Sequence, residues 1–257
     1  MNKGFIAPVI APEEYIFGGL RAPKIIINPG GQWDDFVPTI EHQKKNTETY
    51  NCTAFGTLNA IETLLNRQYG VQKNYSDRAL GIMAGTKPPG NSPQTVAEVA
   101  RKQGLLEEVY LPFDNDVTTP EAYFSPNPLP THLEKKAKQW LAVYELYHEW
   151  VFTPFFKPEE KPSILMESLA YSPVGVSVDA WHQGSDGKYI KKGQDNHWTV
   201  IIGYKEGEYW KCYDSYDDAV KHLAWDYNFD FGKSYRVVRK EAGSQGWFTR
   251  FMMKFCK

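Results

Sequence analysis

Residues 51–65 read Asn-Cys-Thr-Ala-Phe-Gly-Thr-Leu-Asn-Ala-Ile-Glu-Thr-Leu-Leu. Apolar residues recur here, and on to Gly70, at intervals of three and four, which predicts an amphipathic helix. Cys52 falls in its first turn, where unpaired backbone N–H groups and the positive end of the helix dipole favour a thiolate over a thiol. Cys52 is therefore a candidate nucleophile, and a small buried side chain without chemistry is the alternative.

The apolar pattern changes from helical to extended along the chain. Further helices are expected over 92–104 and 133–150. After Pro173 the apolar residues alternate with a period of two, which predicts strands over 174–179, 197–203, 208–214 and 234–239. Helices followed by antiparallel strands are the layout of an α+β fold, here expected as two lobes.

One catalytic domain preceded by an extended segment is the expected organisation. Residues 1–36 are rich in Pro, Gly and short apolar runs, and we expect them to lie extended against the folded body. The domain then covers 37–257. It divides in sequence order into a helical lobe, a β lobe and a C-terminal tail, which are 37–165, 166–240 and 241–257.

Two side chains of the predicted β lobe can complete a catalytic group with Cys52. His197 opens a predicted strand directly after the turn-forming residues 193–196, so its ring is expected at a strand end. Asp214 lies seventeen residues further on, at the far end of the next strand of a predicted hairpin. From there its carboxylate can reach the imidazole, fix its tautomer and stabilise its charged form.

Three stretches together resemble the catalytic blocks of papain-like cysteine peptidases. They read Asn-Cys-Thr-Ala-Phe-Gly at 51–56, Asn-His-Trp-Thr-Val-Ile-Ile-Gly-Tyr at 196–204 and Tyr-Trp-Lys-Cys-Tyr-Asp-Ser-Tyr at 209–216. Their order also matches the family order of Cys, His and Asn or Asp. The resemblance covers about 37–240 and implies a papain-like two-lobe fold, in which the cysteine starts the central helix of one lobe and the sheet of the other supplies His and Asp.

The resemblance also implies an oxyanion site and a peptide-binding loop. In this family the cysteine N–H and the amide of an upstream glutamine hold the oxyanion. Gln43, nine residues before Cys52, is the preferred match, and Asn46, six residues before it, is the alternative. The stretch Pro-Gly-Asn-Ser-Pro-Gln at 89–94 resembles the loop that pairs with the bound peptide, with an ordinary turn as the alternative. The candidate substrate-binding residues are Gly90, Asn91 and Asn196.

The sequence departs from the family pattern at several positions. Thr53 stands where tryptophan is usual, Asp214 replaces the usual asparagine, and the family's disulfide beside the active site has no second cysteine here. An aspartate should favour the charged imidazolium more strongly than an amide does. The segment 1–36 is shorter and poorer in helical pattern than the family's inhibitory propeptide, so control by zymogen cleavage is not expected.

Composition limits the class of protein. The chain carries 29 Lys+Arg and 31 Asp+Glu, so its net charge of -2 gives no electrostatic reason to expect a nucleic acid or a membrane as partner. Its 42% of hydrophobic residues suffice for a core. We expect neither a transmembrane helix nor a signal peptide. Three cysteines make no disulfide framework, so a reducing, cytoplasmic location is expected.

The expected function is a cysteine peptidase that needs no cofactor or metal. Cys52 would form an acyl-enzyme, His197 would act as acid and base, and Asp214 would orient His197. Two alternatives share this scaffold: a transglutaminase-like acyl transferase or cell-wall amide hydrolase, and a non-catalytic module of a larger assembly. The expected partners are a peptide or protein substrate and a protein bound at a C-terminal apolar stripe, Phe248, Phe251, Met252 and Phe255.

Overall fold

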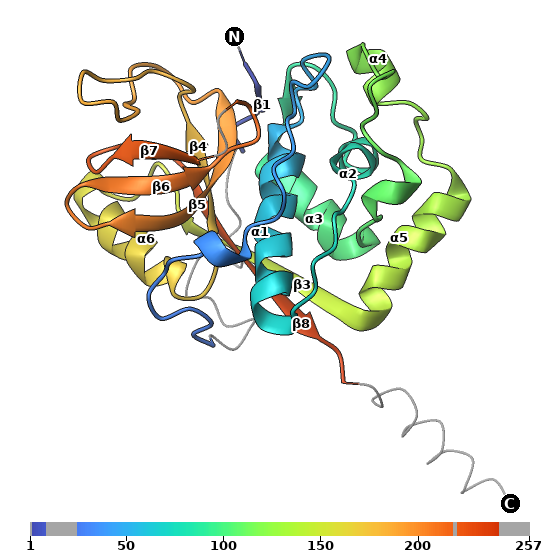
Figure 1. Ribbon diagram of the computed structural model, residues 1–257, viewed down its shortest axis with the longest axis horizontal. Coiled ribbons are helices and arrows are strands. Elements are labelled where there is room, and N and C mark those ends of the chain that lie inside the picture. The colour runs from blue at the N-terminus through green and yellow to red at the C-terminus, as the bar shows by residue number, and fades with distance from the viewer. Residues whose placement is uncertain (1, 9–24, 218–219, 242–257) are drawn as a thin grey trace, which may run out of the picture.

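The computed structural model describes residues 2–8, 25–217 and 220–241. Helices and short 3-10 turns (η) alternate with strands along the chain (Figure 1). In chain order the elements are β1 (Gly4–Phe5), η2 (Asp34–Phe36), α1 (Cys52–Tyr69), α2 (Asp77–Met83), β2 (Gly90–Asn91), α3 (Pro93–Gln103), η3 (Glu108–Tyr110), α4 (Pro120–Tyr123), α5 (Thr131–Val143), β3 (Tyr144–Phe152), η4 (Pro158–Glu160), α6 (Lys161–Leu169), β4 (Val174–Val178), β5 (His197–Lys205), β6 (Tyr209–Tyr213), β7 (Val220–Ala224) and β8 (Gly232–Arg239).

The larger sheet is antiparallel throughout and forms one side of the molecule. Its strand order is β3-β8-β4-β5-β6-β7, with β4 and β5 in the middle. All five residues of β4 are buried, as expected for a strand covered on both faces. The helix α6 packs on β3, β4 and β5, while α2 to α5 gather on the opposite side of the molecule (Figure 1). The predicted α+β architecture is confirmed.

The helix α1 stands between the sheet and the other helices (Figure 1). Its first fourteen residues are all buried, so it has no solvent face over most of its length. The indole of Trp198 on β5 lies so close to Gly56 that a Cβ there would be 2.7 Å from indole Cδ1. Glycine at position 56 therefore allows the N-terminal half of α1 to approach β5. This approach sets the start of α1 beside the start of β5.

Two elements differ from the sequence predictions. The helix expected over 133–150 ends at Val143, and Tyr144–Phe152 forms β3 instead. That prediction was wrong because Tyr144 and Tyr147 extend the helical spacing by coincidence, whereas the segment alternates buried and exposed residues and pairs with β8. β3 thus joins the sheet from within the predicted helical lobe. Strand β7 was not predicted, since its polar residues hide the alternation.

Other boundaries follow the predictions closely. The helix expected from Ser92 to Gly104 is α3, with the Ser92 hydroxyl accepting from the Gln94 N–H at 3.2 Å. The C-terminal stripe at 248–255 lies outside the described residues, as do residues 1 and 9–24 of the segment 1–36. Among the helices in the described ranges, none combines the length and the apolar character needed to cross a membrane.

The central position of β5 yields a stability prediction. Val200 on β5 is fully buried, whereas Val220 on the edge strand β7 is 49% exposed. We expect Val200→Ala to lower the free energy of unfolding by roughly 2 kcal/mol, because it removes two buried carbons and leaves a cavity. Val220→Ala should change it by less than about 0.5 kcal/mol. Urea unfolding of both variants measures the difference, and equal losses would contradict the assigned burial.

Candidate active site

Cys52 is the first residue of α1 and is fully buried. It lies in one buried apolar cluster with Trp198 on β5, and the backbone N–H groups of Trp198 and Thr53 act to lower the pKa of its thiol. The thiol therefore lies where the helix start meets the start of β5. Since His197 is the residue directly before Trp198, the start of the strand that carries His197 lies beside Cys52, although the two residues are 145 positions apart in the sequence.

His197 and Asp214 form a direct, buried pair. The ring Nε2 of His197 lies 2.6 Å from Oδ1 of Asp214, and both side chains are fully excluded from solvent. His197 opens β5 and Asp214 follows the last residue of β6, so the antiparallel pairing of these strands sets the contact. The other ring nitrogen, Nδ1, is buried and makes no hydrogen bond to the described protein atoms. It is the nitrogen left to exchange a proton with a thiol.

The second carboxylate oxygen of Asp214 has two further donors. The indole Nε1 of Trp181 donates to Oδ2 at 3.0 Å, and the ammonium of Lys221 donates to it at 2.9 Å. Burial by itself raises the pKa of Asp214, but the charges and hydrogen bonds of His197 and Lys221 outweigh burial and hold the pKa below its usual value. Asp214 is therefore ionised at neutral pH and can stabilise an imidazolium.

The Trp181 ring also packs edge-on against the His197 ring, with the centroids 5.7 Å apart and an interplanar angle of 77°. The Tyr216 ring also packs against this imidazole, with centroids 5.9 Å apart. Two aromatic side chains thus contact the imidazole. The indole that contacts both His197 and Asp214 comes from the loop before β5.

The two candidate oxyanion amides lie in different places. Gln43 is fully buried and is tied to the residue after Asp214, because its backbone N–H donates to the Ser215 carbonyl at 2.8 Å and its Oε1 accepts from the Ser215 hydroxyl at 3.1 Å. Asn46 points instead to the loop beyond α3, donating to the Asp114 carbonyl at 3.1 Å. Only Gln43 of these two has its amide anchored beside the segment that carries Asp214.

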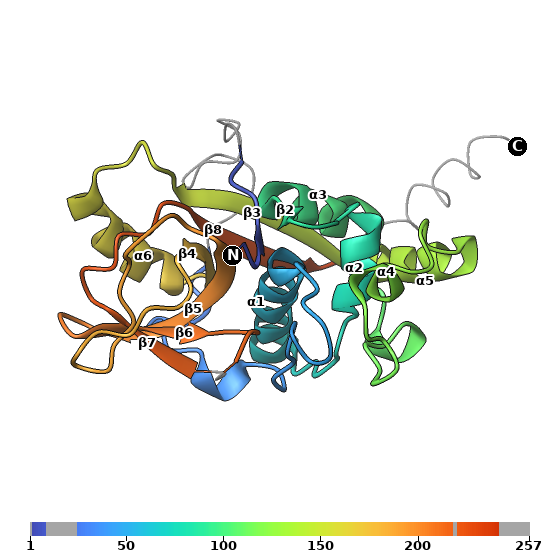
Figure 2. The same ribbon diagram turned by 90° about the horizontal axis from the view of Figure 1, so that it is seen from above.

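The N-terminal segment crosses this site. Strand β1 pairs in parallel with β2, with Gly4 opposite Gly90 and Phe5 opposite Asn91. The Lys3 N–H donates to the Asn196 carbonyl at 2.8 Å, and the Ile6 N–H donates to the Asn91 carbonyl at 2.9 Å. In Figures 1 and 2 this dark blue segment lies beside the start of α1, between the sheet and the helices.

The same segment covers the candidate catalytic groups. Phe5 stacks on Trp198 with centroids 5.9 Å apart and joins Cys52 in one buried apolar cluster. The side-chain amide of Gln43 donates to the Lys3 carbonyl at 2.9 Å and to Glu48 at 3.1 Å. Gly4 has φ +119°, and a Cβ there would collide with the Tyr50 carbonyl, so the close passage requires glycine.

A peptide backbone from the chain's own N-terminal segment therefore lies against the predicted substrate-binding residues, Gly90, Asn91 and Asn196. Their side chains are used elsewhere: the Asn91 amide donates to the Ala84 carbonyl at 2.9 Å, and the Asn196 Oδ1 accepts from the Ala180 N–H at 3.0 Å. The backbone carbonyls of the two asparagines accept the N-terminal segment. These asparagines thus present main-chain acceptors held in place by their own amides.

Burial reverses one expectation about Cys52. The helix start predicts a lowered pKa, but exclusion from water raises the pKa of the Cys52 thiol, and the charges of Glu48 and Asp214 add to this rise against the opposing N–H of Trp198. With the N-terminal segment in place the sulfur is a neutral thiol at pH 7. The expectation fails because the sequence does not reveal what covers the cysteine.

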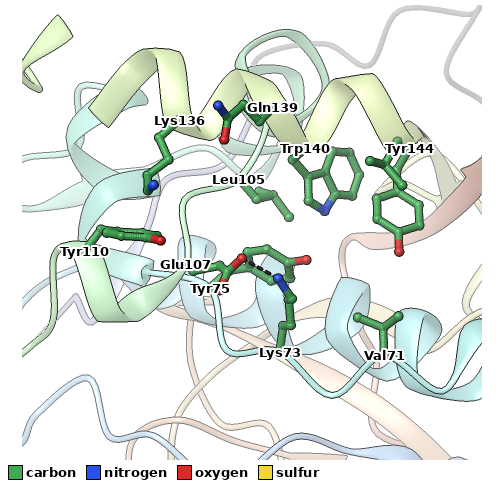
Figure 3. Close-up of a pocket in the computed structure, with 11 residues that line it drawn as sticks. Val71, Lys73, Tyr75, Leu105, Glu107, Tyr110, Lys136, Gln139, Trp140 and Tyr144 are labelled. Atoms are coloured by element: carbon green, nitrogen blue, oxygen red, sulfur yellow. Dashed lines mark hydrogen bonds and ion pairs between the residues drawn. The ribbon is translucent and has the colours of Figure 1, made fainter. Parts of the chain in front are cut away.

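Other cavities lie away from these groups. One of about 310 Å³ is lined by α5 and the chain after α1, with Trp140 and Tyr144 on one wall and an ion pair of Lys73 and Glu107 on another (Figure 3). It contains none of the candidate catalytic residues. Within the described ranges, no group of three or more His, Cys, Asp or Glu side chains could hold a metal ion.

Sequence reasoning missed two partners of the candidate site, Trp181 and Lys221. Lys221 was missed because its strand was not predicted: Lys221 is buried on the same face as Leu223, whereas Val220 is exposed, so the apolar pattern does not mark the inward face. Trp181 was missed because it lies in a loop whose path only the fold defines.

Comparisons with known proteins agree with this geometry at the level of fold. Neither a protein-family model nor a curated protein matches the sequence. Among solved structures, the chain is similar to digestive procathepsin L 3 from the larval midgut of Tenebrio molitor, with a TM-score of 0.60 and 14% identity over 86% of this chain and 77% of that one. Digestive procathepsin L2 proteinase from the same midgut gives a TM-score of 0.60 and 15% identity over 93% and 78%.

Bromelain protease from Ananas comosus, in complex with the E64 inhibitor, gives a TM-score of 0.50 and 17% identity over 85% of this chain and 99% of that one. At such identities the shared feature is the fold. The chain has the papain-like fold, as a divergent example of it, and the predicted resemblance is confirmed at that level.

The position of the N-terminal segment predicts how the thiol becomes reactive. Gly4→Val should expel the segment, because a side chain at Gly4 meets the Tyr50 carbonyl and the φ of Gly4 disfavours other residues. We expect iodoacetamide to modify Cys52 at least about tenfold faster in this variant, since exposure restores a thiolate. Peptide mass mapping of time-quenched samples measures the rate at Cys52.

Ile6→Ala is the matched control, because Ile6 lies in the same segment but its side chain is 39% exposed. This variant should be modified at the wild-type rate. Equal rates in the wild type and Gly4→Val would show that the segment does not protect Cys52.

Proposed function

We propose that the protein is a cysteine peptidase that hydrolyses peptide bonds through an acyl-enzyme on Cys52. One observation carries the proposal: Cys52 packs in a buried cluster with Trp198 at the start of β5, while His197, the first residue of that strand, pairs with the ionised Asp214 at 2.6 Å. A nucleophile beside a base that is oriented by a third group is the arrangement of covalent acyl transfer. The papain-like fold supports the same reaction class.

Acylation uses the groups in the following order. The Cys52 thiol transfers its proton to Nδ1 of His197, and the resulting thiolate attacks the carbonyl carbon of the scissile peptide bond. The charge then developing on the carbonyl oxygen is held by the Cys52 N–H and the Gln43 amide. The His197 imidazolium, stabilised by Asp214, gives its proton to the leaving amine, and the C–N bond breaks to leave a thioester.

Deacylation reverses the proton transfers with water as the nucleophile. His197 removes a proton from water, the hydroxide adds to the thioester carbonyl, and collapse of that adduct releases the acid and the Cys52 thiolate. His197 then returns its proton to sulfur. Asp214 keeps Nε2 protonated throughout, so Nδ1 is the nitrogen that exchanges protons in both half-reactions.

A peptide is the proposed substrate because the site already pairs with one. The carbonyls of Asn91 and Asn196 accept N–H groups from Ile6 and Lys3, which are backbone donors present in any peptide. The Gln43 amide donates to the carbonyl of Lys3, an atom equivalent to the carbonyl oxygen of a substrate. A substrate must therefore displace residues 3–6, which use the same groups.

Loss of the thiol should abolish activity. In the Gly4→Val background, Cys52→Ala is expected to lower the cleavage of a fluorogenic peptide library by roughly 10³-fold or more. Cys212→Ala is the matched control, because Cys212 is equally buried but contacts the Thr199 hydroxyl in the sheet. Undiminished cleavage by Cys52→Ala would overturn the proposal, whereas labelling of Cys52 without any turnover would favour a non-catalytic module.

The two oxyanion candidates can be separated by substitution. Gln43→Ala should reduce kcat by about 10²-fold to 10³-fold, since one donor to the oxyanion is lost. Asn46→Ala should leave kcat close to that of the parent protein, because the Asn46 amide serves the 114–117 loop. Steady-state kinetics in the Gly4→Val background measures both. A larger loss for Asn46→Ala would reassign the oxyanion donor.

A further inference from the structure

We infer that Lys221 is a positioning residue of the catalytic group, whose ammonium balances the charge of Asp214 so that His197 faces a nearly neutral partner. The inference rests on the proposed function for its consequence in catalysis. Its physical basis is independent of that function, because it concerns three buried titratable groups, with Asp214 in direct contact with the other two.

The contacts show that the Asp214 carboxylate lies between the imidazole of His197 and the ammonium of Lys221. Oδ1 of Asp214 lies 2.6 Å from His197 Nε2, and Oδ2 lies 2.9 Å from Lys221 Nζ. The side chains of all three are fully excluded from solvent. The carboxylate lies between the ammonium and the imidazole and interacts with both. The positive charge of Lys221 therefore offsets the electrostatic effect of Asp214 on the imidazole.

The surroundings of Lys221 suit an ion that stays charged. Its Nζ lies 5.1 Å from the Trp181 ring centroid and 5.9 Å from that of Tyr189, both within cation–π range. Burial by itself lowers the pKa of Lys221, but Asp214 and a second ion pair with Asp217 outweigh burial and raise the pKa. Lys221 therefore remains an ammonium throughout the pH range in which a histidine titrates.

Other titratable groups also act on this cluster. The charges of Glu48 and Asp214 act on the Cys52 thiol. The Lys3 ammonium interacts with the charges of Asp214, Asp217, Glu48 and Lys221. The Cys212 thiol interacts with the charges of Asp214 and Lys221. Tyr216 packs against the His197 ring. The ammonium groups of Lys44 and Lys3 lie over the Tyr216 ring. Of these groups, only Lys221 and His197 donate a hydrogen bond to the Asp214 carboxylate from a charged or chargeable side chain.

This arrangement accounts for the aspartate at position 214. The resemblance leads one to expect an asparagine, whose neutral amide orients the imidazole without adding charge. An uncompensated buried carboxylate would stabilise the imidazolium and destabilise a nearby thiolate. Lys221 supplies the compensating charge from β7, so Asp214 and Lys221 together act as a neutral pair.

The test is a charge cycle read at His197 by NMR. We propose to titrate the Hε1 resonance of His197 in the full-length wild type, Lys221→Met, Asp214→Asn and the double variant. Lys221→Met should raise the pKa of His197 by about one unit, because the carboxylate is no longer balanced. Asp214→Asn should lower that pKa by a similar amount, and the double variant should return to within about 0.3 unit of the wild type.

Lys205→Met is the control, because Lys205 lies on β5 but its side chain is 60% exposed and pairs with Glu208. It should leave the titration of His197 unchanged. If the His197 titration curve of Lys221→Met coincides with that of the wild type, the inference is overturned. A lysine with a structural role only would leave the pKa of His197 unchanged.

The inference can still be tested if the Lys221→Met variant does not fold. If Lys221→Met does not fold, the double variant and Asp214→Asn still differ only by the charge of Lys221, and the inference requires a higher His197 pKa in the double variant. Equal values there would overturn it. Because NMR needs no substrate, a protein that cleaves no peptide but shows the predicted shifts would refute the peptidase function and leave the charge balance standing.

In an active enzyme the same cycle should appear in the pH dependence of kcat/KM, measured in the Gly4→Val background. Lys221→Met should move both limbs of the profile to higher pH, because the carboxylate then favours the imidazolium and opposes the thiolate. The double variant should move both limbs back. A loss of rate without any displacement of the limbs would assign Lys221 a structural role only.

Discussion

The close contact between α1 and β5 is the constraint on which the site depends. The Trp198 indole fills the space that a side chain at position 56 would occupy, so the helix and strand meet without a gap. This contact places the first residue of the helix against the first residues of the strand, where Cys52 and Trp198 share one buried apolar cluster.

Burial dominates the electrostatics of the site. A buried ion is costly unless charges and hydrogen bonds surround it, and Asp214 has an imidazole, an indole and an ammonium to meet that need. Within the described ranges Cys52 has no charged partner of this kind, so exclusion from water keeps it a neutral thiol beneath Phe5. The same burial thus accompanies a charged carboxylate at Asp214 and an uncharged thiol at Cys52.

Local patterns predicted much of the fold, including α1 from its helical spacing and β4 to β6 from their alternation. The hairpin expected between the strands that carry His197 and Asp214 also predicted that these two side chains can meet, and they lie in contact. Contacts between residues far apart in the sequence could not be predicted. β3 is defined by its pairing with β8, and the Trp181 indole contacts Asp214 from a loop. The pairing of residues 3–6 with Gly90 left no periodicity in the sequence, because the strand is only two residues long.

The central claim is that Cys52 becomes acylated by the substrate. The direct measurement is intact-mass spectrometry of the Gly4→Val protein, quenched in acid during turnover of an activated peptidyl ester, with peptide mapping of the modified chain. The account predicts one acyl group, located on Cys52, that appears before product and decays at the rate of product release. Product formation without an acylated chain, or an acyl group located on another residue, would contradict it.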